Sequence, residues 1–329
     1  NQSVIALDKT DPIEVNYEHK IGNDPTGKEH PELLKMHSSH GHDQTIVNGI
    51  GRIGYMSGGH TARWTDEELS LTFLAKAKEF IQQKHKEPFF LYFSLTEPHV
   101  PRMPATLFKG KSKLGFRGDA ILQLDWTVGE IMKQVQALGL EKSTIIVFSS
   151  DNGPVLDDGY QDGAVTRQNG HNPFGPFRGG KYSIFEAGTR IPWIISWPGK
   201  IKPGTSAALI SHIDLIRSFA HLLKQPVPAG EAPDSENQWA ALSGQSQTGR
   251  TALVEHGRVL AIVQNNWKYI EPGRGPKLVQ EVNIETGVDE QPQLYDLQKD
   301  PGEKNNVAAT HPEKVKELAA LLEEIRNKH

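Results

Sequence analysis

Two short segments carry side chains that are suited to bind a ligand. Asp151 and Asn152 directly follow the apolar run TIIVFSS (144–150), and His99 lies four residues after the apolar run FFLYFSL (89–95). Carboxylate and amide oxygens are the hard donors that calcium and magnesium prefer. Prolines on both sides of His99 stiffen its backbone, which favours a fixed direction for the ring. These residue types therefore predict a cation site and a nearby polar contact.

The segment 151–190 is a long stretch that is rich in glycine and shows no long helical pattern. It also holds several aromatic residues, which are unusual in a disordered linker, and long irregular loops in compact domains are commonly functional. Gly179 and Gly180 let the backbone approach a ligand closely, so Lys181 is a candidate contact for an anion. The alternatives are ordinary ones: a common Asp-Asn-Gly turn, a turn histidine and a solvated lysine.

The apolar pattern predicts alternating strands and helices up to residue 225. Three nearly continuous apolar runs predict strands that are buried on both faces, at 89–95, 144–150 and 191–197. Helices are predicted from a capping box at Thr65 and Glu68 to about His85, and then at 121–138, where Gly139 ends the helix, and at 213–223. This alternation predicts an α/β fold with a mainly parallel sheet and helices on both faces. Ligands of such sheets bind beyond the carboxyl ends of the strands.

The pattern changes after a connector rich in proline and glycine at 225–238. Short strands are predicted within 251–256, 259–270 and 293–300, and a final helix carries apolar residues on one face from Val315 to Ile325. We therefore expect two parts, 1–225 and 226–329, the second being a small antiparallel sheet with a helix.

The overall composition excludes several classes of function. The 329 residues carry a formal net charge of −4, which provides no basic field for nucleic acid. The chain has no apolar run long enough to span a bilayer. It has no cysteine, which excludes disulfides, thiolate metal sites and a cysteine nucleophile. Residue 1 is Asn rather than Met, so we expect a processed, truncated or partly shown chain.

The motifs, taken in order, resemble those of the type I sulfatases of the alkaline phosphatase superfamily. The motifs are P-H-x-P at 98–101, S-D-N-G at 150–153, G-G-K at 179–181, E-x-G-x-R-x-P at 186–192 and LYDLQKDPGEKNNVA at 294–308. The resemblance covers roughly residues 60–325. It implies an alkaline phosphatase-like fold and a sulfuric ester hydrolase. Residues 1–225 would be the later part of the catalytic domain, and 226–329 a C-terminal α+β subdomain.

The resemblance also implies roles for individual residues. Asp151 and Asn152 would bind one divalent cation, Ca²⁺ in the usual case or Mg²⁺. His99 and Lys181 would be the catalytic residues that contact the sulfate and the bridging oxygen of the ester. Positive charge and a proton donor at that oxygen stabilise the transition state more than the ground state.

Two further positions of the motif, Glu186 and Arg190, resemble residues with a structural role in the family. We expect them to form an ion pair that braces the loop carrying Lys181.

The sequence departs from the family at the nucleophile. Sulfatases form a formylglycine from Cys or Ser in a C/S-x-P-x-R motif, and this chain has none. The nearest match, Ser196 to Lys200, has Lys in place of Arg and follows Lys181 instead of preceding it. We therefore expect upstream sequence to supply the nucleophile and the acidic metal ligands, as a missing N-terminal segment or a second chain. The present chain alone is expected to be inactive and not self-sufficient in folding.

The substrate is less constrained. Polar residues of the loops, namely His171, Asp158, Arg178 and His60, are candidate contacts for sugar hydroxyls or further sulfates, although each also suits a solvated loop. The resemblance to bacterial sulfatases implies a small-molecule or saccharide sulfate ester as the substrate. It also implies a periplasmic or secreted protein.

Two other functions stay open. One is a phosphomonoesterase or phosphodiesterase of the same superfamily, which Asn152 disfavours because Asn is a poor zinc ligand. The other is a catalytically inactive, sulfatase-like carbohydrate-binding protein. Metal stoichiometry distinguishes the first from a sulfatase, and the sequence preceding residue 1 distinguishes the second.

Overall fold

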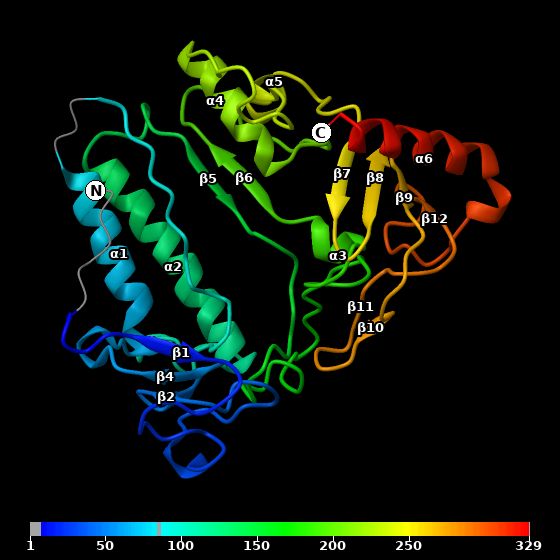
Figure 1. Cartoon of the computed structure of the whole chain (residues 1–329). Helices are drawn as coiled ribbons and strands as arrows, with labels where there is room; N and C mark the ends of the chain where they lie inside the picture. The colour runs from blue at the N-terminus through cyan, green and yellow to red at the C-terminus, as the bar shows by residue number, and fades with distance from the viewer. Residues whose placement is uncertain (1–7, 84–86, 329) are drawn as a thin grey trace. The chain divides into compact units, whose positions relative to one another are not determined.

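The computed structural model describes residues 8–83 and 87–328, which form two units (Figure 1). Unit 1 comprises Asn1–Leu140 and Leu156–Asn172, and unit 2 comprises Glu141–Val155 and Pro173–His329. The boundary predicted near residue 225 falls inside unit 2 and stays a prediction about its subdomains.

Unit 1 combines two small antiparallel ladders with two long helices. Strand β1 (Glu14–Asn16) pairs with β4 (Tyr55–Ser57), and β2 (Ile46–Val47) pairs with β3 (Ile50–Gly51). Helices α1 (Asp66–Gln82) and α2 (Gly115–Ala137) lie side by side, and the short 3-10 helices η1 (Pro31–Leu33) and η2 (His60–Ala62) lie in the loops (Figure 1). Both long helices were predicted.

The start of α1 differs in detail from the prediction. Thr65 occupies the N-cap position, but its hydroxyl makes no capping hydrogen bond, so the predicted capping box with Glu68 is wrong. Glu68 instead donates its backbone N–H to the Thr65 carbonyl at 3.0 Å. Asp66, at the first helical position, forms a bidentate ion pair with Arg52. The helix buries one face, made by Ser70, Leu74, Ala77 and Ile81.

Part of the long glycine-rich segment belongs to unit 1. Tyr160 is buried in a core cluster with Met36, Ile50 and Met103. Its hydroxyl donates a 2.6 Å hydrogen bond to the Gly51 carbonyl, and burial raises the pKa of this phenol. Residues 156–172 are therefore a packed part of unit 1, in agreement with the expectation that this segment is not a disordered linker.

The run 89–95 does not form the predicted strand. It has no strand assignment, and the Phe90 and Tyr92 side chains are 74% and 81% exposed. A strand needs a neighbour to pair with its backbone N–H and C=O groups. Within residues 8–83 and 87–328, no segment pairs with this run as a strand.

The first part of unit 2 carries the other two predicted strands. Strand β5 (Ile146–Ser149) pairs with β6 (Trp193–Ser196), with Ile146 opposite Ser196, and the pairing is antiparallel. The residues of β5 are only half-buried and Ile194 of β6 is 59% exposed, so the predicted burial on both faces is not reached in this chain. Helix α3 (Glu186–Thr189) precedes β6.

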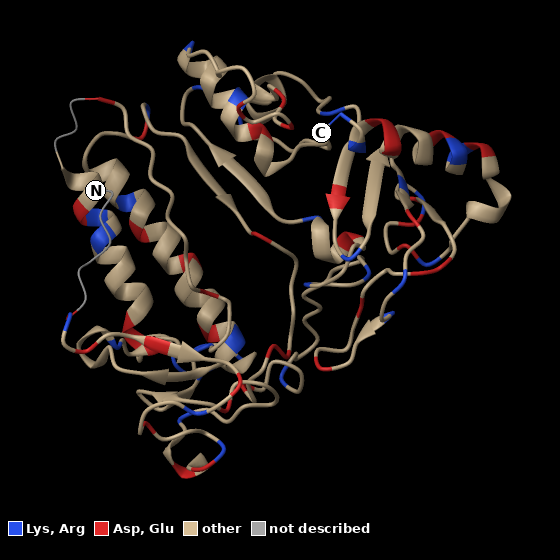
Figure 2. Ribbon diagram, viewed as in Figure 1, with Lys and Arg blue, Asp and Glu red and all other residues tan. Residues whose placement is uncertain are grey.

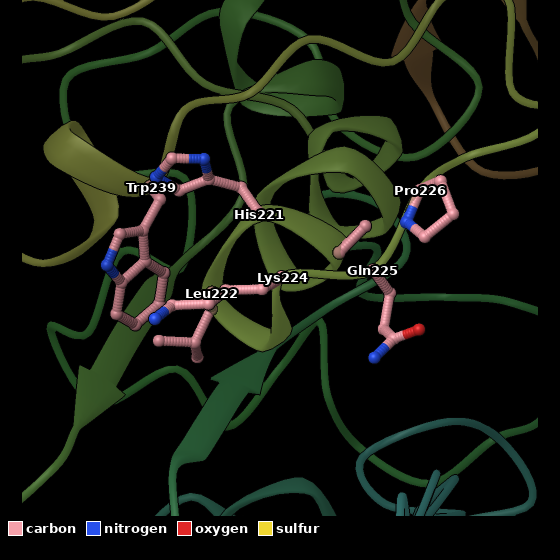
Figure 3. A pocket seen from close by; sticks show the side chains of 7 residues that line it. His221, Leu222, Lys224, Gln225, Pro226 and Trp239 are labelled. Carbon is pink, nitrogen blue, oxygen red and sulfur yellow. The ribbon is translucent and has the colours of Figure 1, made fainter.

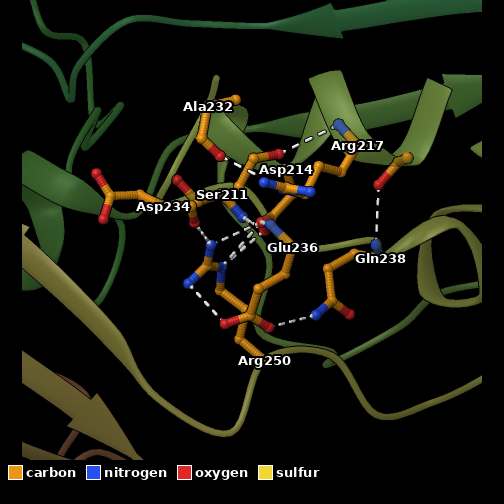
Figure 4. Close-up of polar contacts among 10 residues, drawn as sticks. Ser211, Asp214, Arg217, Ala232, Asp234, Glu236, Gln238 and Arg250 are labelled. Atoms are coloured by element: carbon orange, nitrogen blue, oxygen red, sulfur yellow. Dashed lines mark hydrogen bonds and ion pairs between the residues drawn. The ribbon is translucent and has the colours of Figure 1, made fainter. Parts of the chain in front are cut away.

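A buried ion pair holds the connector 225–238, which lies among the short helices that follow β6. The helices are η3 (His212–Asp214), α4 (Leu215–Leu223), which was predicted, and α5 (Trp239–Leu242). The fully buried Asp214 accepts a 2.7 Å bond from Arg250 and a 3.0 Å bond from the Glu236 backbone N–H (Figure 4). The connector is therefore tied to the start of α4 rather than left loose.

The rest of unit 2 is the predicted antiparallel sheet with a helix. The strand order is β12-β9-β8-β7, from Gln293–Asp296, Trp267–Ile270, Leu260–Gln264 and Leu253–His256. Helix α6 (Pro312–Arg326) lies beside this sheet (Figure 1). Its Leu318 and Leu322 belong to a buried core cluster with Ile262, Tyr269 and Leu294 of the sheet. A separate hairpin joins β10 (Leu278–Val279) to β11 (Ile284–Glu285), and the short η4 (Ala308–Thr310) precedes α6.

Acidic and basic residues are interspersed along the chain (Figure 2), and their numbers nearly balance, with a formal net charge of −4. None of the helices in the described part of the chain combines the length and the apolar content needed to cross a membrane.

Candidate cation and anion site

The carboxyl end of β5 presents two oxygen-bearing side chains. Asp151 is exposed, and its Oδ1 accepts a 3.0 Å hydrogen bond from the Asn152 backbone N–H. The amide nitrogen of Asn152 donates to the Gly153 carbonyl at 2.9 Å. An amide NH2 group only donates hydrogen bonds, so the amide oxygen is the atom that Asn152 can offer to a cation.

The next residue docks the turn against helix α3. Gly153 donates its N–H to the Gly188 carbonyl at 2.9 Å. A Cβ at Gly153 would overlap the carbonyl oxygen of Ala187, so only glycine fits this close approach of two backbones. The direction of the turn is therefore set by α3.

The same neighbourhood contains the candidate lysine. Lys181 donates its backbone N–H to the Pro154 carbonyl at 2.9 Å, and a Cβ at Gly180 would press against that oxygen. The Lys181 ammonium lies 5.3 Å from the Tyr182 ring. Unit 2 thus brings the Asp151–Asn152 turn and the Lys181 loop together through their backbones.

The donor set fits a hard divalent cation. Such ions take six or more oxygens as ligands, and Asp151 and Asn152 supply side-chain oxygens from an exposed turn. In the ranges 8–83 and 87–328, no three His, Asp or Glu side chains gather closely enough to hold a metal by themselves. The two residues can therefore form only part of a cation cage.

Helix α3 is itself braced by charge. Arg190 Nη1 lies 3.2 Å from Glu186 Oε2, so the predicted ion pair is confirmed. The other oxygen of Glu186 accepts a 3.0 Å bond from the buried Lys268. Glu186 is buried and Arg190 is half exposed, so the carboxylate is held mainly from the inside of unit 2.

The candidate histidine lies in unit 1. His99 Nδ1 is 2.7 Å from the Val100 carbonyl, an acceptor, so this nitrogen carries the proton and donates it. His99 Nε2 lies 3.8 Å from Oδ2 of the buried Asp158. Two of the predicted site residues, His99 and Asp158, are therefore neighbours.

A buried arginine fixes the turn around His99. Arg102 donates from Nε to the Pro98 carbonyl and from Nη1 to the Leu156 carbonyl, both at 2.9 Å. It also forms an ion pair with Asp162, and both side chains are almost fully buried. The turn is thus attached to the segment that carries Asp158.

His42 lies near the candidate residues His99 and Asp158, and the sequence patterns did not single it out. Its ring contacts Tyr160 with centroids 4.5 Å apart, and a Cβ at Gly159 would overlap it. Burial lowers the pKa of His42, although the nearby Asp158 carboxylate opposes this shift. The H-G-H sequence that ends at His42, in a glycine-rich loop, was the available signal.

The other predicted substrate contacts have partners of their own. His60 Nδ1 lies 3.1 Å from Asp11 Oδ2, and His171 Nδ1 lies 3.4 Å from Arg117 Nη1. Arg178 forms a bidentate pair with Glu285 at 2.7 and 2.6 Å, donates to the Glu303 carbonyl at 2.8 Å and lies over the Phe185 ring. These contacts give Arg178 a clear role inside unit 2.

The convergence of His99 and Lys181 on one anion stays a prediction, because the two residues belong to different units. An open hollow beside α4 holds none of the predicted site residues (Figure 3). It is lined by Ala220, His221, Leu222, Lys224, Gln225, Pro226 and Trp239.

Comparison with known proteins decides the family. A family model described as Sulfatase matches residues 15–225. The chain belongs to the sulfatase family. It is 54% identical to an N-acetylgalactosamine-6-O-sulfatase of Bacteroides thetaiotaomicron, over all of this chain and 65% of that protein. It is 30% identical to human arylsulfatase A, over 73% of this chain and 49% of the relative. The sulfatase chain thus spans less than two thirds of these relatives.

Solved structures confirm the fold. One is described under the metabolism of multiple glycosaminoglycans by Bacteroides thetaiotaomicron. It is 54% identical, with a TM-score of 0.96 over 98% of this sulfatase chain and 68% of that chain. A Pseudoalteromonas sulfatase, PsFucS1, has a TM-score of 0.66 at 22% identity, over 79% of this chain and 53% of that chain. The alkaline phosphatase-like α/β fold with a C-terminal antiparallel sheet is therefore established, and family membership supports a metal-dependent, formylglycine-using enzyme in general.

Proposed function

We propose that the complete protein hydrolyses sulfate esters at a site that contains one divalent cation. The observation that carries this proposal is the 2.9 Å hydrogen bond from Lys181 N to Pro154 O. It places a candidate anion-binding lysine beside the Asp151–Asn152 turn within one unit. Ca²⁺ is the proposed ion, with Mg²⁺ as the alternative, because both ligands offer hard oxygens.

Each residue has a definite task in this mechanism. When bound, the cation supplies positive charge to the sulfate and to the nucleophile. The Lys181 ammonium neutralises a sulfate oxygen, which favours the transition state as negative charge moves to the leaving group. His99 is held with Nδ1–H on the Val100 carbonyl, so it is the imidazolium form, with its second proton on Nε2, that delivers this Nε2 proton to the bridging oxygen. The formylglycine nucleophile and further metal ligands come from a preceding N-terminal segment or a second chain.

We propose a sulfated saccharide as the substrate, specifically a 6-O-sulfated N-acetylgalactosamine unit. The relative at 54% identity carries that activity in its name. Asp158, beside His99, is proposed to accept hydrogen bonds from the sugar, with His60 and His171 as more distant contacts. Arg178 enters the proposal as a brace of the loop, because its donors are used within unit 2. A sulfated polysaccharide substrate agrees with a periplasmic or secreted protein.

The metal part of this proposal is tested by calorimetric titration of the complete protein with Ca²⁺ and Mg²⁺. We expect one ion per molecule and a large loss of affinity in Asp151→Ala. Unchanged affinity in that variant would sink the assignment. Two ions per molecule would favour a phosphoesterase instead.

The requirement for upstream sequence is tested by expressing residues 1–329 alone and with the preceding segment. The exposed Phe90, Tyr92 and Ile194 side chains support the need for a covering segment. We expect the shorter protein to aggregate and to lack activity on an aryl sulfate. A monomeric, cooperatively unfolding and active short protein would contradict both expectations.

A further inference from the structure

A lysine lies completely buried in the C-terminal sheet among three carboxyl groups. Lys268 of β9 is 0% exposed. Its Nζ lies 2.8 Å from Glu255 Oε2, 3.0 Å from Glu186 Oε1 and 3.7 Å from Glu303 Oε1. We refer to these four residues as the Lys268 cluster.

The charges of the Lys268 cluster do not balance. One ammonium faces three carboxyl groups, and charge is costly to bury unless it is paired. Burial raises the pKa of Glu303 to about 7, although Lys268 opposes the shift. Burial also lowers the pKa of Lys268, but the carboxylates outweigh this effect and the pKa is raised overall. The cluster therefore keeps its lysine charged and holds Glu303 partly protonated near neutrality.

Lys268 and Glu303 both form hydrogen bonds with Glu186, the first residue of α3. Lys268 donates to the Glu186 side chain, and the Glu186 backbone N–H donates to Glu303 Oε2 at 2.6 Å. A helix start leaves backbone N–H groups without helical partners, and a carboxylate is a favourable acceptor there. Lys268, Glu255 and Glu303 all belong to the C-terminal part of unit 2. That part therefore fixes α3 through two contacts that join residues 82 and 117 positions apart in the sequence.

Two further backbone contacts join α3 to the segments that carry the candidate site residues. Its Gly188 carbonyl accepts the N–H of Gly153, next to the proposed metal ligands. The Ala187 N–H donates to the Arg178 carbonyl at 2.8 Å, at the start of the loop that holds Lys181. A shift of α3 would therefore move both the Asp151–Asn152 turn and the Lys181 loop.

We propose that Lys268 and Glu303 are positioning residues, which hold the cation turn and the anion-binding lysine in register through α3. This inference rests on the proposed function for the roles of Asp151, Asn152 and Lys181. The bracing itself rests only on the contacts described. It assigns to the C-terminal subdomain a part in setting the geometry of the site.

The competing view is that the Lys268 cluster stabilises only the C-terminal sheet. The two views predict different regions of increased flexibility when the Lys268 cluster is disrupted. A positioning role predicts loosening at 150–156 and 178–190, whereas a purely structural role predicts equal loosening in all strands of the sheet.

The test compares two substitutions of one residue in the complete protein. Glu303→Gln keeps an acceptor for the Glu186 N–H, and Glu303→Leu keeps the bulk but removes the acceptor. The control is Lys277→Met, which breaks an exposed ion pair with Asp289 in the same subdomain. Hydrogen exchange is measured by mass spectrometry on peptides covering 150–156, 178–190 and β7 to β9, and kcat is measured on a sulfate ester.

We expect Glu303→Leu to speed exchange in 150–156 and 178–190 by about tenfold, with little change in β7 to β9. Its kcat should fall by about tenfold to a hundredfold, as for small misplacements of catalytic groups. Glu303→Gln and Lys277→Met should behave like the wild type. Exchange that stays unchanged, or that rises equally in the sheet, would overturn the proposal.

Glu186→Gln serves as a milder second variant if Glu303→Leu does not fold. It weakens the contact with Lys268 but keeps the backbone N–H on Glu303, so exchange in the two peptides should rise several-fold. Wild-type exchange in this variant would also overturn the proposal. The exchange measurements need no catalysis, so a protein without sulfatase activity would defeat the proposed function and leave the bracing to be decided separately.

Discussion

The turn that holds His99 and the loop that holds Lys181 are each braced by a buried cation, but the two braces are built differently. In unit 1, Arg102 forms an ion pair with Asp162 and also donates to two backbone carbonyls. In unit 2, Lys268 faces three carboxyl groups. The first brace is neutral as a pair, and the second carries an excess of acid.

This difference has physical consequences. A guanidinium keeps its charge at any ordinary pH and its planar fork binds several acceptors at once. Arg102 therefore fixes the His99 turn in a manner that changes little near neutrality. In the Lys268 cluster, burial raises the pKa of Glu303 to about 7, so we expect the brace of the Lys181 loop to depend on pH near neutrality.

The largest expected effect separates the chemistry of the two regions. In the complete protein, we expect His99→Ala and Lys181→Ala each to lower kcat by about 10²–10⁴-fold. The loss in His99→Ala should grow as the leaving group becomes a poorer one, because the proton donor is missing. The loss in Lys181→Ala should be nearly constant across the series. Steady-state kinetics on aryl sulfates with different leaving groups measures this, with the exposed Lys200→Ala as the control. If the loss of kcat depended equally on the leaving group in both variants, the proposed separate roles of His99 and Lys181 would be wrong.

The next effect concerns the stability of unit 1. Arg102→Met removes the ion-pair partner of the buried Asp162, and removing one partner of a buried pair costs about 3–5 kcal/mol. Urea unfolding, followed by exchange of unit 1 amides, should show this loss. The double variant with Asp162→Leu should recover a large part of it. A loss below about 1 kcal/mol would show that the Arg102–Asp162 pair contributes no more to stability than an exposed ion pair does.

A smaller effect concerns pH and unit 2. The folded pKa of Glu303, about 7, lies above its ordinary value of 4.5, so the folded state binds more protons between these limits. The free energy of unfolding should therefore fall as pH rises through this window and level off above it. The groups that face Glu303 are Lys268, Glu186, Glu255, Arg178 and Tyr295.

Urea unfolding of the wild type and of Glu303→Gln isolates this contribution when it is followed from about pH 5 to about pH 8, a range that spans most of the interval between the two pKa values. The difference in unfolding free energy between the two proteins should change with pH, because only the wild type has the titrating Glu303 carboxyl group. A difference that does not vary with pH would show that Glu303 stays in one protonation state.

The smallest effects compare two glycines. Gly153→Ala forces a Cβ into the Ala187 carbonyl, so we expect a loss of about 1–3 kcal/mol from overpacking. Gly129, inside α2, has open space within 4 Å of the point where a Cβ would stand, so Gly129→Ala should stabilise unit 1 by about 0.4–1 kcal/mol. Thermal unfolding of both variants measures the pair. A tolerated Gly153→Ala would show that α3 can move away from the turn.

Local patterns predicted helices α1, α2, α4 and α6 and the C-terminal sheet, because each of these elements has a clear periodicity of its own; the four-residue helices α3 and α5 were not predicted. The run 89–95 was predicted with the same logic and failed, because apolar residues favour a strand but only a neighbouring strand can satisfy its backbone. Phe90 and Tyr92 remain exposed in this chain for that reason. The antiparallel pairing of β5 with β6 likewise depends on topology, which residue types do not encode.

The site was predictable in part. Asp151, Asn152 and Lys181 stood out because glycines and strand ends mark the places where a chain approaches a ligand. The Lys268 cluster did not stand out, since single charged residues in a strand or a loop normally lie at the surface. Only the folded chain shows that Glu186 and Glu303, 117 positions apart, meet at one helix start.

The discontinuity of unit 1 bears on how the protein is made. A ribosome delivers Arg102 and the helices α1 and α2 first, then the strand β5 of unit 2, and only afterwards Tyr160 and Asp162. Until those residues emerge, the nascent chain has a guanidinium without its carboxylate and an apolar cluster without its tyrosine. Unit 1 therefore completes its fold only after part of unit 2 has been synthesised, and a chain released at residue 140 would lack the residues that close it.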